Sequence, residues 1–399
     1  MRWSASIRVV LCLFLVLTCV IASPGFVFAQ DASDRGRMYV GAGVELWPTP
    51  DIGGHGYGLL TYQRDDLVRE ADIDLTFNTD TLILSARDFK LDDTIRLGGF
   101  VKGEARFAGL LIDYYEQGDL AKERGFSAGF IQGAAQLDVK DAPVFLQLEL
   151  GGRRWFFQPL ETTTPDLVLP PDMWVFEPKL RMTYWKIAHD ASISDPHRHY
   201  WRVRGWGFGA ELGSDYRENW RPWGQVEDAA LNGEQRNNAG EQPIYGRAWL
   251  RAGRQLHDRF RLQASLFMAL GRGEDDLTRV RVGGMNPYVV SLAGLPWASY
   301  LPENFGTAQL STHVRLFADH EVGLLVDHMQ LSEADARRTD YTATTDGLGA
   351  SLQGIGLFGD FRWGSGWQVH ARAGYAFPSS YLAQNPHTNV WFSLGKQIF

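Results

Sequence analysis

Long segments in which apolar and polar side chains alternate constrain this chain more than any other sequence feature. The alternation is clearest in residues 259–271, where the apolar positions are Phe260, Leu262, Ala264, Leu266, Met268 and Leu270. The same period of two recurs in residues 94–107, 142–153 and 307–319. Because successive side chains of a strand point to opposite faces, each segment predicts a strand with one apolar and one polar face.

Strand length separates a soluble sandwich from a membrane barrel. Soluble strands average about five or six residues, whereas a tilted membrane strand needs roughly nine to eleven. Sixteen strands are predicted, most of them ten residues or longer, at 38–47, 55–64, 67–79, 82–91, 94–107, 125–139, 142–157, 173–188, 198–213, 243–256, 259–271, 306–319, 321–332, 345–361, 366–377 and 388–399. No segment after residue 29 has an apolar run long enough for a membrane helix, so a closed barrel is the remaining way to span a membrane.

The predicted connections alternate in length along the chain. Those at 140–141 and 257–258 are short, whereas those at 108–124, 214–242 and 272–305 are long. Two connections break this pattern, at 80–81, which is short, and at 189–197, which is long. Short turns at one end and long loops at the other are typical of outer-membrane barrels. The fold class predicted is therefore all-β, a sixteen-stranded antiparallel transmembrane β-barrel in the bacterial outer membrane.

The N-terminus has the pattern of a secretory signal. Arg2 and Arg8 precede an apolar run, and Val27-Phe28-Ala29 is a suitable cleavage site. We therefore expect residues 1–29 to be a signal peptide and residues 30–399 to be a single barrel domain. An uncleaved membrane anchor and a lipoprotein that uses Cys19 are the alternatives.

The last predicted strand ends with an aromatic residue. Its Ser393, Gly395 and Ile398 resemble the polar-x-Gly-x-x-hydrophobic signal that barrel proteins present to the barrel-assembly machinery. Phe399 departs from that signal because it directly follows Ile398. We expect these four residues to act as the assembly signal and outer-membrane lipid to surround the barrel.

Residues 259–399 resemble the superfamily of outer-membrane insertases and two-partner secretion transporters, which includes bacterial surface antigens. The segments that carry the likeness are 279–288, 324–327 and 392–396, and five predicted strands follow the long loop 272–305, as they follow the sixth outer loop of that family. The resemblance implies that this loop folds into the lumen and that the barrel acts in protein or lipid handling. The family's Val-Arg-Gly-aromatic motif is absent from 272–305, and its periplasmic domains are missing, which implies a separate periplasmic partner.

The resemblance also implies how the loop is held. Arg281, or else Arg279, would donate to a carboxylate on the wall, with Asp327 as the acceptor and Glu149 as the alternative. The pair Gly283 and Gly284 permits a tight turn. A planar guanidinium can bind a carboxylate through two parallel hydrogen bonds. If Asp327 faces the lumen then so does Leu325, which requires a bulge or a partly apolar lumen.

Other functions remain alternatives at the level of sequence. A passive diffusion porin or a structural surface protein would share the same strand pattern. We expect neither an enzyme nor a cofactor, because the nucleophile-elbow string in residues 125–129 is followed by a strand, where that motif needs a helix. The formal net charge of −8 argues against nucleic acid as a partner. Asp275 and Asp276 are interpreted as part of a solvated loop. Gly205, Gly207 and Gly209 indicate either clearance for an inserted loop or relief of strain in a curved sheet.

Overall fold

A computed structural model describes most of the chain between residues 36 and 398. The described ranges are 36–47, 53–64, 71–78, 81–105, 114–116, 119–121, 125–141, 143–188, 204–226, 235–237, 241–284, 290–295, 301–317, 320–332, 351–363, 366–377 and 387–398. The predicted signal peptide 1–29 and Phe399 lie outside these residues, so both assignments stay predictions.

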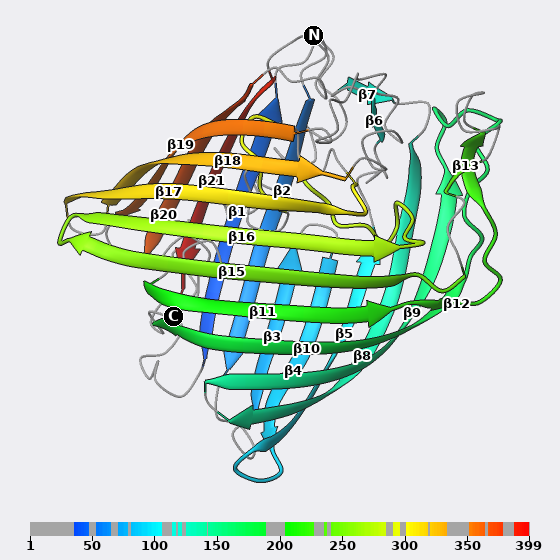
Figure 1. Cartoon of the computed structure of the whole chain (residues 1–399), viewed down its shortest axis with the longest axis horizontal. Helices are drawn as coiled ribbons and strands as arrows, with labels where there is room; N and C mark the ends of the chain where they lie inside the picture. Colours follow the sequence, from blue (N-terminus) through cyan, green and yellow to red (C-terminus); the bar gives the residue numbers. More distant parts are fainter. Residues whose placement is uncertain are drawn as a thin grey trace, which may run out of the picture.

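The described residues form strands joined by turns and loops (Figure 1). The strands are β1 (Arg37–Trp47), β2 (Gly53–Arg64), β3 (Asp72–Asn78), β4 (Thr81–Lys90), β5 (Ile95–Ala105), β6 (Tyr114–Glu116), β7 (Asp119–Ala121), β8 (Phe126–Asp141), β9 (Val144–Pro159), β10 (Trp174–Ala188), β11 (Arg204–Ser214), β12 (Tyr216–Arg217), β13 (Trp223–Val226), β14 (Gln235–Asn237), β15 (Ile244–His257), β16 (Phe260–Arg272), β17 (Phe305–Phe317), β18 (His320–Leu331), β19 (Ser351–Trp363), β20 (Trp367–Ala376) and β21 (His387–Gln397). Each of the sixteen predicted strands corresponds to one of these elements, with bounds that differ by a few residues.

One antiparallel sheet closes on itself to form the barrel wall. Each wall strand pairs with the next along the chain, and β1 pairs with β21, from Tyr39 opposite Gln397 to Leu46 opposite Val390. The short strand β12 continues β11 beyond Asp215 and pairs with the same neighbour, β10. The wall therefore has sixteen strands, as the sequence predicts. Closure satisfies the backbone groups that an open sheet edge would leave unpaired inside a membrane. Two small hairpins, β6–β7 and β13–β14, lie outside the wall sheet.

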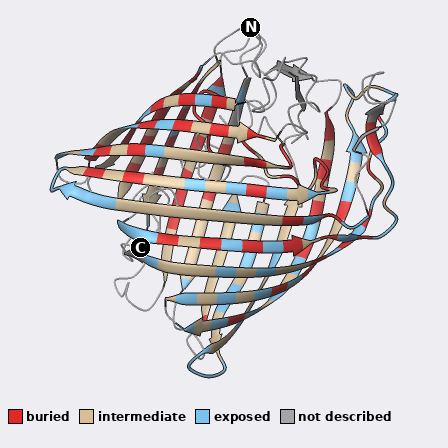
Figure 2. Cartoon of the chain, viewed as in Figure 1, coloured by how far each residue is buried: buried red, intermediate tan, exposed pale blue. Residues whose placement is uncertain are grey.

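The two faces of the wall differ in chemistry. On β16, Leu266, Met268 and Leu270 are about half exposed, whereas Arg261 and Gln263 on the other face are buried. Figure 2 shows the same alternation of buried and exposed residues along several wall strands. An outer face of exposed leucine, valine and phenylalanine is the surface that lipid chains cover. Among the described residues, no helix is both long and apolar enough to cross a membrane.

The inner face is partly apolar. Leu325 is fully buried in a cluster with Tyr39, Tyr57, Leu59, Ala293, Phe358 and Trp391. The pairing of β17 with β18 is irregular only between Arg315 and Phe317, far along the strand from Asp327. Of the two solutions that the sequence left open for Leu325 and Asp327, the structure therefore has the partly apolar lumen.

Candidate functional site at the β16–β17 connection

The connection between β16 and β17 is described at residues 273–284, 290–295 and 301–304, and it lies against the inner face of the wall at two places. We call residues 273–279 the stem, and residues 281–284 together with 290–295 the inner turn. The stem contacts side chains of β12, β13 and β15, whereas the inner turn contacts β18 and β21. In the closed sheet, β16 and β17 lie between β15 and β18, and β19 and β20 lie between β18 and β21, so the two groups contact different parts of the wall. The connection therefore links two parts of the wall through the interior of the barrel.

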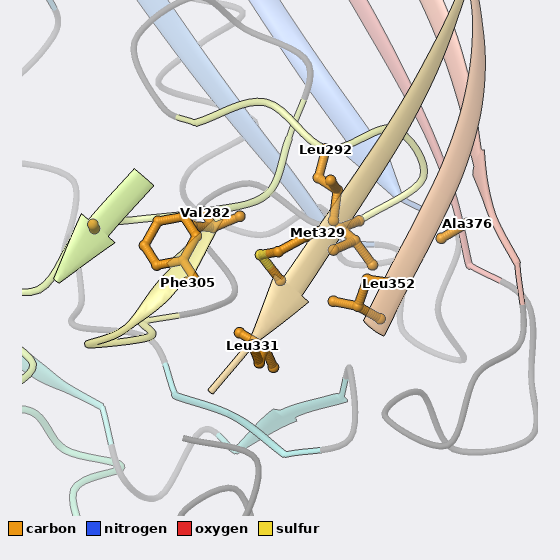
Figure 3. Close-up of a cluster of buried hydrophobic side chains, with 9 residues drawn as sticks. Val282, Leu292, Phe305, Met329, Leu331, Leu352 and Ala376 are labelled. Atoms are coloured by element: carbon orange, nitrogen blue, oxygen red, sulfur yellow. The ribbon is translucent and has the colours of Figure 1, made fainter. Parts of the chain in front are cut away.

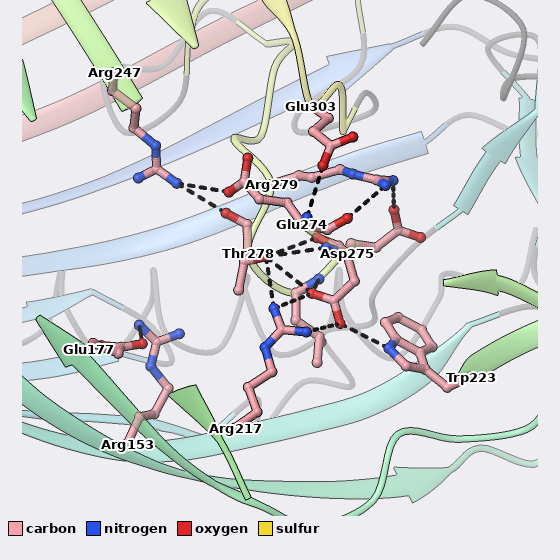
Figure 4. A network of polar contacts seen from close by, with 12 residues as sticks. Arg153, Glu177, Arg217, Trp223, Arg247, Glu274, Asp275, Thr278, Arg279 and Glu303 are labelled. Carbon is pink, nitrogen blue, oxygen red and sulfur yellow. Dashed lines mark hydrogen bonds and ion pairs between the residues drawn. The ribbon is translucent and has the colours of Figure 1, made fainter. Parts of the chain in front are cut away.

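The stem is anchored by a buried ion pair. Asp275 accepts two hydrogen bonds from the Arg217 guanidinium, at 3.0 and 3.1 Å, and a third from Trp223 Nε1 at 2.9 Å. The side chains of Arg217 and Asp275 are 1% and 0% exposed. Thr278 Oγ1 also accepts from Arg217 at 3.1 Å (Figure 4). A bidentate pair with further hydrogen bonds is the arrangement in which burying two charges is tolerated.

A second set of contacts fixes the stem's shape. Arg279 donates to Asp276 Oδ1 at 2.9 Å and to the Glu274 carbonyl at 2.8 Å. Arg247 of β15 donates to the Thr278 carbonyl at 3.1 Å and lies 3.6 Å from a carboxylate oxygen of Glu274. Burial raises the pKa of the Glu274 carboxyl to about 8, although Arg247 and Arg279 oppose the shift. At neutral pH this carboxyl is therefore mostly protonated.

The inner turn is folded on itself by backbone hydrogen bonds. The Gly283 N–H donates to the Val290 carbonyl, and the Gly284 N–H donates to the Leu295 carbonyl, each at 3.0 Å. Gly283 and Gly284 have φ values of 113° and 89°, in the left-handed region that favours glycine. The glycine pair therefore allows the tight turn for which the sequence analysis selected it.

Side chains of the wall hold the inner turn through its backbone. Asp327 accepts from the Ala293 N–H at 2.8 Å and from Gln309 at 2.7 Å. Asn389 of β21 accepts from the Gly294 N–H at 2.9 Å, and its own amide group donates to the Leu295 carbonyl at 3.0 Å and to Glu45 of β1 at 2.7 Å. Because β1 and β21 close the barrel, Asn389 joins the inner turn to both strands of the closing seam.

Apolar packing accompanies these hydrogen bonds. Figure 3 shows Val282 and Leu292 of the inner turn among side chains of β17 to β20. The approach of the two backbones is close: a Cβ on Gly294 would lie 2.0 Å from the Ala376 nitrogen, and a Cβ on Gly354 would lie 2.5 Å from the Ala293 carbonyl oxygen. Gly294 also has a positive φ of 85°. Glycine is therefore required where the inner turn meets the wall.

The structure brings together some of the predicted site residues and separates others. Asp327 does contact the connection, but its donor is the Ala293 N–H in place of a guanidinium. Arg279 pairs with Asp276 inside the stem, because the two residues lie three apart in one local turn. The Arg281 carbonyl accepts from the Val290 N–H at 3.2 Å, within the inner turn. Glu149 is bound by Lys179 and Gln136 on the wall.

An ion pair does join the connection to the wall, but the acidic and basic residues are on the opposite elements from those predicted. The carboxylate, Asp275, comes from the connection, and the arginine, Arg217, comes from the wall. The interpretation of Asp275 and Asp276 as a solvated cluster is wrong, since both are buried. The sequence analysis missed Arg217 and Trp223. The signal that could have found them is the arginine- and tryptophan-rich stretch 216–223, which is complementary in charge to the acidic residues 274–276.

The residues of the predicted assembly signal lie along the closing seam. Ser393 and Gly395 of β21 are opposite Gly43 and Gly41 of β1, and the Ile398 N–H donates to the Met38 carbonyl at 2.8 Å. A Cβ on Gly395 would lie 1.9 Å from the Tyr39 hydroxyl. Gly395 therefore has a packing role in the folded barrel, whatever its role in assembly.

The nucleophile-elbow string lies in the described part of the chain. The string 125–129 leads into β8 (Phe126–Asp141), so Ser127 lies on a strand without the strand–turn–helix geometry of a nucleophile elbow. Within the described ranges, no three His, Cys, Asp or Glu side chains gather closely enough to hold a metal ion.

Comparisons with known proteins identify solved structures with a similar fold. No protein-family model matches the sequence, and no curated protein matches it. Among solved structures, BamA from Haemophilus ducreyi lacking POTRA domains 1–3 has a TM-score of 0.55 at 12% identity, over 91% of this chain and 71% of that one. CdiB from Acinetobacter baumannii has a TM-score of 0.53 at 10% identity, over 90% of this chain and 60% of that one.

CdiB from Escherichia coli is similar, with a TM-score of 0.52 at 10% identity, over 90% of this chain and 63% of that one. This chain thus spans less than two thirds of either CdiB chain. At such identities the likeness concerns the fold, which is that of a sixteen-stranded bacterial outer-membrane barrel. It agrees with the superfamily resemblance seen in the sequence.

Proposed function

We propose that this barrel acts in protein or lipid handling at the bacterial outer membrane, with the β16–β17 connection as a sixth outer loop that is folded into the lumen. The observation that carries the proposal is the fixed inner turn, whose backbone is held by Asp327 and Asn389. A segment held against two parts of the inner wall occupies part of the lumen and obstructs it. A barrier of this kind suits a barrel that handles chains or lipids better than one that passes small solutes continuously.

The partners follow from the same proposal. Outer-membrane lipid covers the apolar outer face, and the barrel-assembly machinery inserts the chain after removal of residues 1–29. A separate periplasmic protein, the partner that the family resemblance implies, would deliver the client. Asn389 links the inner turn to Glu45 across the closing seam. A movement of the inner turn would then be transmitted to the pairing of β1 with β21.

Conductance in planar bilayers tests the obstructed lumen. We expect the purified barrel to show small and infrequent openings, and a variant that lacks residues 281–295 to show larger and longer ones. A matched variant with Leu324→Ala, on the lipid face of β18, should conduct like the parent chain. Large and stable open steps of the parent chain would contradict the proposal and support the alternative, a passive diffusion porin.

Vesicle assays test the handling of lipid or protein. The barrel is reconstituted into phosphatidylcholine vesicles that contain a short-chain fluorescent phosphatidylethanolamine, and extraction of the inner-leaflet label by serum albumin, which cannot pass through a pore of this size, is followed. In parallel, the rate at which an unfolded outer-membrane barrel protein folds into the same vesicles is measured. Acceleration of either process over heat-unfolded protein supports the proposal. If neither process is accelerated, the proposal is contradicted and the alternative, a structural surface protein, is favoured.

A further inference from the structure

A cavity of about 520 Å³ opens on the inner face of β10, β11, β15 and β16. Six of the side chains that line it are Arg181, Trp185, Glu211, Arg247, Trp249 and Phe267. The residues that alternate with them, such as Leu180, Met182 and Leu266, are exposed on the lipid face. The cavity therefore faces the lumen, beside the stem, and shares Arg247 with it.

Two tryptophans from the strands on either side of β11 line the cavity, and glycines on β11 make room for them. A Cβ on Gly209 would lie 2.3 Å from Trp249 Cζ2, and a Cβ on Gly207 would lie 2.7 Å from Trp185 Cε3. The alternating glycines of β11 thus provide clearance, which is one of the two interpretations of the sequence. The groups that occupy the space are indole rings of the neighbouring strands, in place of an inserted loop. Rings supported from behind by backbone are fixed in orientation, which favours stacking of a flat ligand.

The charged groups of the cavity leave an excess of positive charge. Glu211 is the one carboxylate in its lining, and it accepts from Arg181 Nε at 3.0 Å and lies 3.8 Å from Arg247. Arg247 also faces Glu274, but burial raises the pKa of Glu274 to about 8, so this carboxyl is mostly neutral at pH 7. Arg247 Nε is buried and has no hydrogen-bond partner. Two guanidiniums therefore face one carboxylate.

We infer that this cavity binds a small organic anion with a flat aromatic body. The carboxylate of the ligand would bind Arg181 and Arg247, and its ring would lie against Trp249 and Trp185. Guanidinium groups pair with carboxylates through parallel hydrogen bonds, and a largely apolar cavity with a few convergent polar groups is typical of small-molecule sites. This inference is independent of the role proposed for the inner turn, because the cavity is built from wall residues.

Calorimetric titration of the barrel in lipid nanodiscs with sodium benzoate tests the inference. Benzyl alcohol serves as the neutral probe of the same shape. The variants are Arg181→Met and Trp249→Leu, and the matched control is Trp363→Leu, which removes a tryptophan from the outer face. Gly209→Ala, which keeps every binding group but displaces the Trp249 ring, is compared with Gly103→Ala, whose Cβ would have no atom within 4 Å. Heat-modified gel mobility establishes that each variant is folded.

The expected result is saturable binding of benzoate, weakened about tenfold or more by Arg181→Met and by Trp249→Leu and unchanged in Trp363→Leu. Benzyl alcohol should bind at least about tenfold more weakly than benzoate, because it lacks the charge. Gly209→Ala should weaken binding, whereas Gly103→Ala should not. Absence of saturable benzoate binding, equal binding of benzyl alcohol, or equal loss in Trp363→Leu would each overturn the inference.

Discussion

The stem and the inner turn are held against the same wall by different chemistry. The stem depends on charge, through the buried ion pair Arg217–Asp275. The inner turn depends on neutral hydrogen bonds to its backbone, on apolar packing and on glycines that permit close approach. One connection can therefore be held in two different ways. The stem loses its attachment if either member of one ion pair is removed, whereas the inner turn is held by many weak contacts.

The largest effect should follow from breaking the stem's ion pair. Asp275→Ala leaves the Arg217 guanidinium buried without its partner, which costs about 3–5 kcal/mol of unfolding free energy. The measurement is urea unfolding of the barrel in detergent, followed by tryptophan fluorescence. The double variant Arg217→Met with Asp275→Leu should lose less than Asp275→Ala alone. A loss in the double variant equal to the sum of the losses in Arg217→Met and Asp275→Leu would show that the two residues are not coupled.

Gly294→Ala should give the next largest effect, and it acts on the inner turn alone. Its Cβ would lie 2.0 Å from the Ala376 nitrogen, and φ is 85°, so the backbone must move away from β20. Unfavourable φ and overpacking together cost about 2–4 kcal/mol. The same unfolding measurement is made on Gly103→Ala as a control, which should change stability by less than about 0.5 kcal/mol. Equal losses in the two variants would argue that the inner turn is not docked.

Asn389→Ala should have a smaller effect at the point where the inner turn meets the seam. It removes the acceptor of the Gly294 N–H, one donor to the Leu295 carbonyl and one donor to the Glu45 carboxylate. The expected loss is about 1–3 kcal/mol. Asn389→Asp keeps the acceptor for Gly294 but removes the donor, so it should fall between Asn389→Ala and the parent chain unless the new charge beside Glu45 dominates. An unfolding free energy of Asn389→Ala equal to that of the parent chain would show that the contacts of Asn389 do not stabilise the barrel.

The pH dependence of stability separates the charged stem from the neutral inner turn. Burial raises the pKa of Glu274 from its ordinary value of 4.5 to about 8, so the folded state binds this proton more tightly than the unfolded state does. Stability from this group is therefore fully present below pH 4.5 and is lost as the pH rises to 8. Glu274→Gln should flatten the unfolding free energy between pH 5 and about 8 relative to the parent chain. An unchanged pH profile would contradict the raised pKa.

The strands could be predicted from the sequence because their signal is local. Alternation and strand length depend on neighbouring residues, so β16 and β18 were placed to within one or two residues. The docking contacts could not be predicted in the same way. Arg217 of β12 and Asp275 of the β16–β17 connection lie 58 residues apart, and nothing local pairs them. The donor to Asp327 is a backbone N–H, a group that every residue except proline carries and that leaves no mark in a sequence.

Amide hydrogen exchange of the inner turn tests the central claim most directly. In the parent barrel, residues 290–295 should exchange far more slowly than the exposed loop residues 161–166, because wall side chains bind the Ala293 and Gly294 amides. The double variant Asp327→Ala with Asn389→Ala should bring residues 290–295 close to the rate of the exposed loop, while peptides of β16 stay protected. Fast exchange of residues 290–295 in the parent chain would contradict the claim that the connection is fixed to the inner wall.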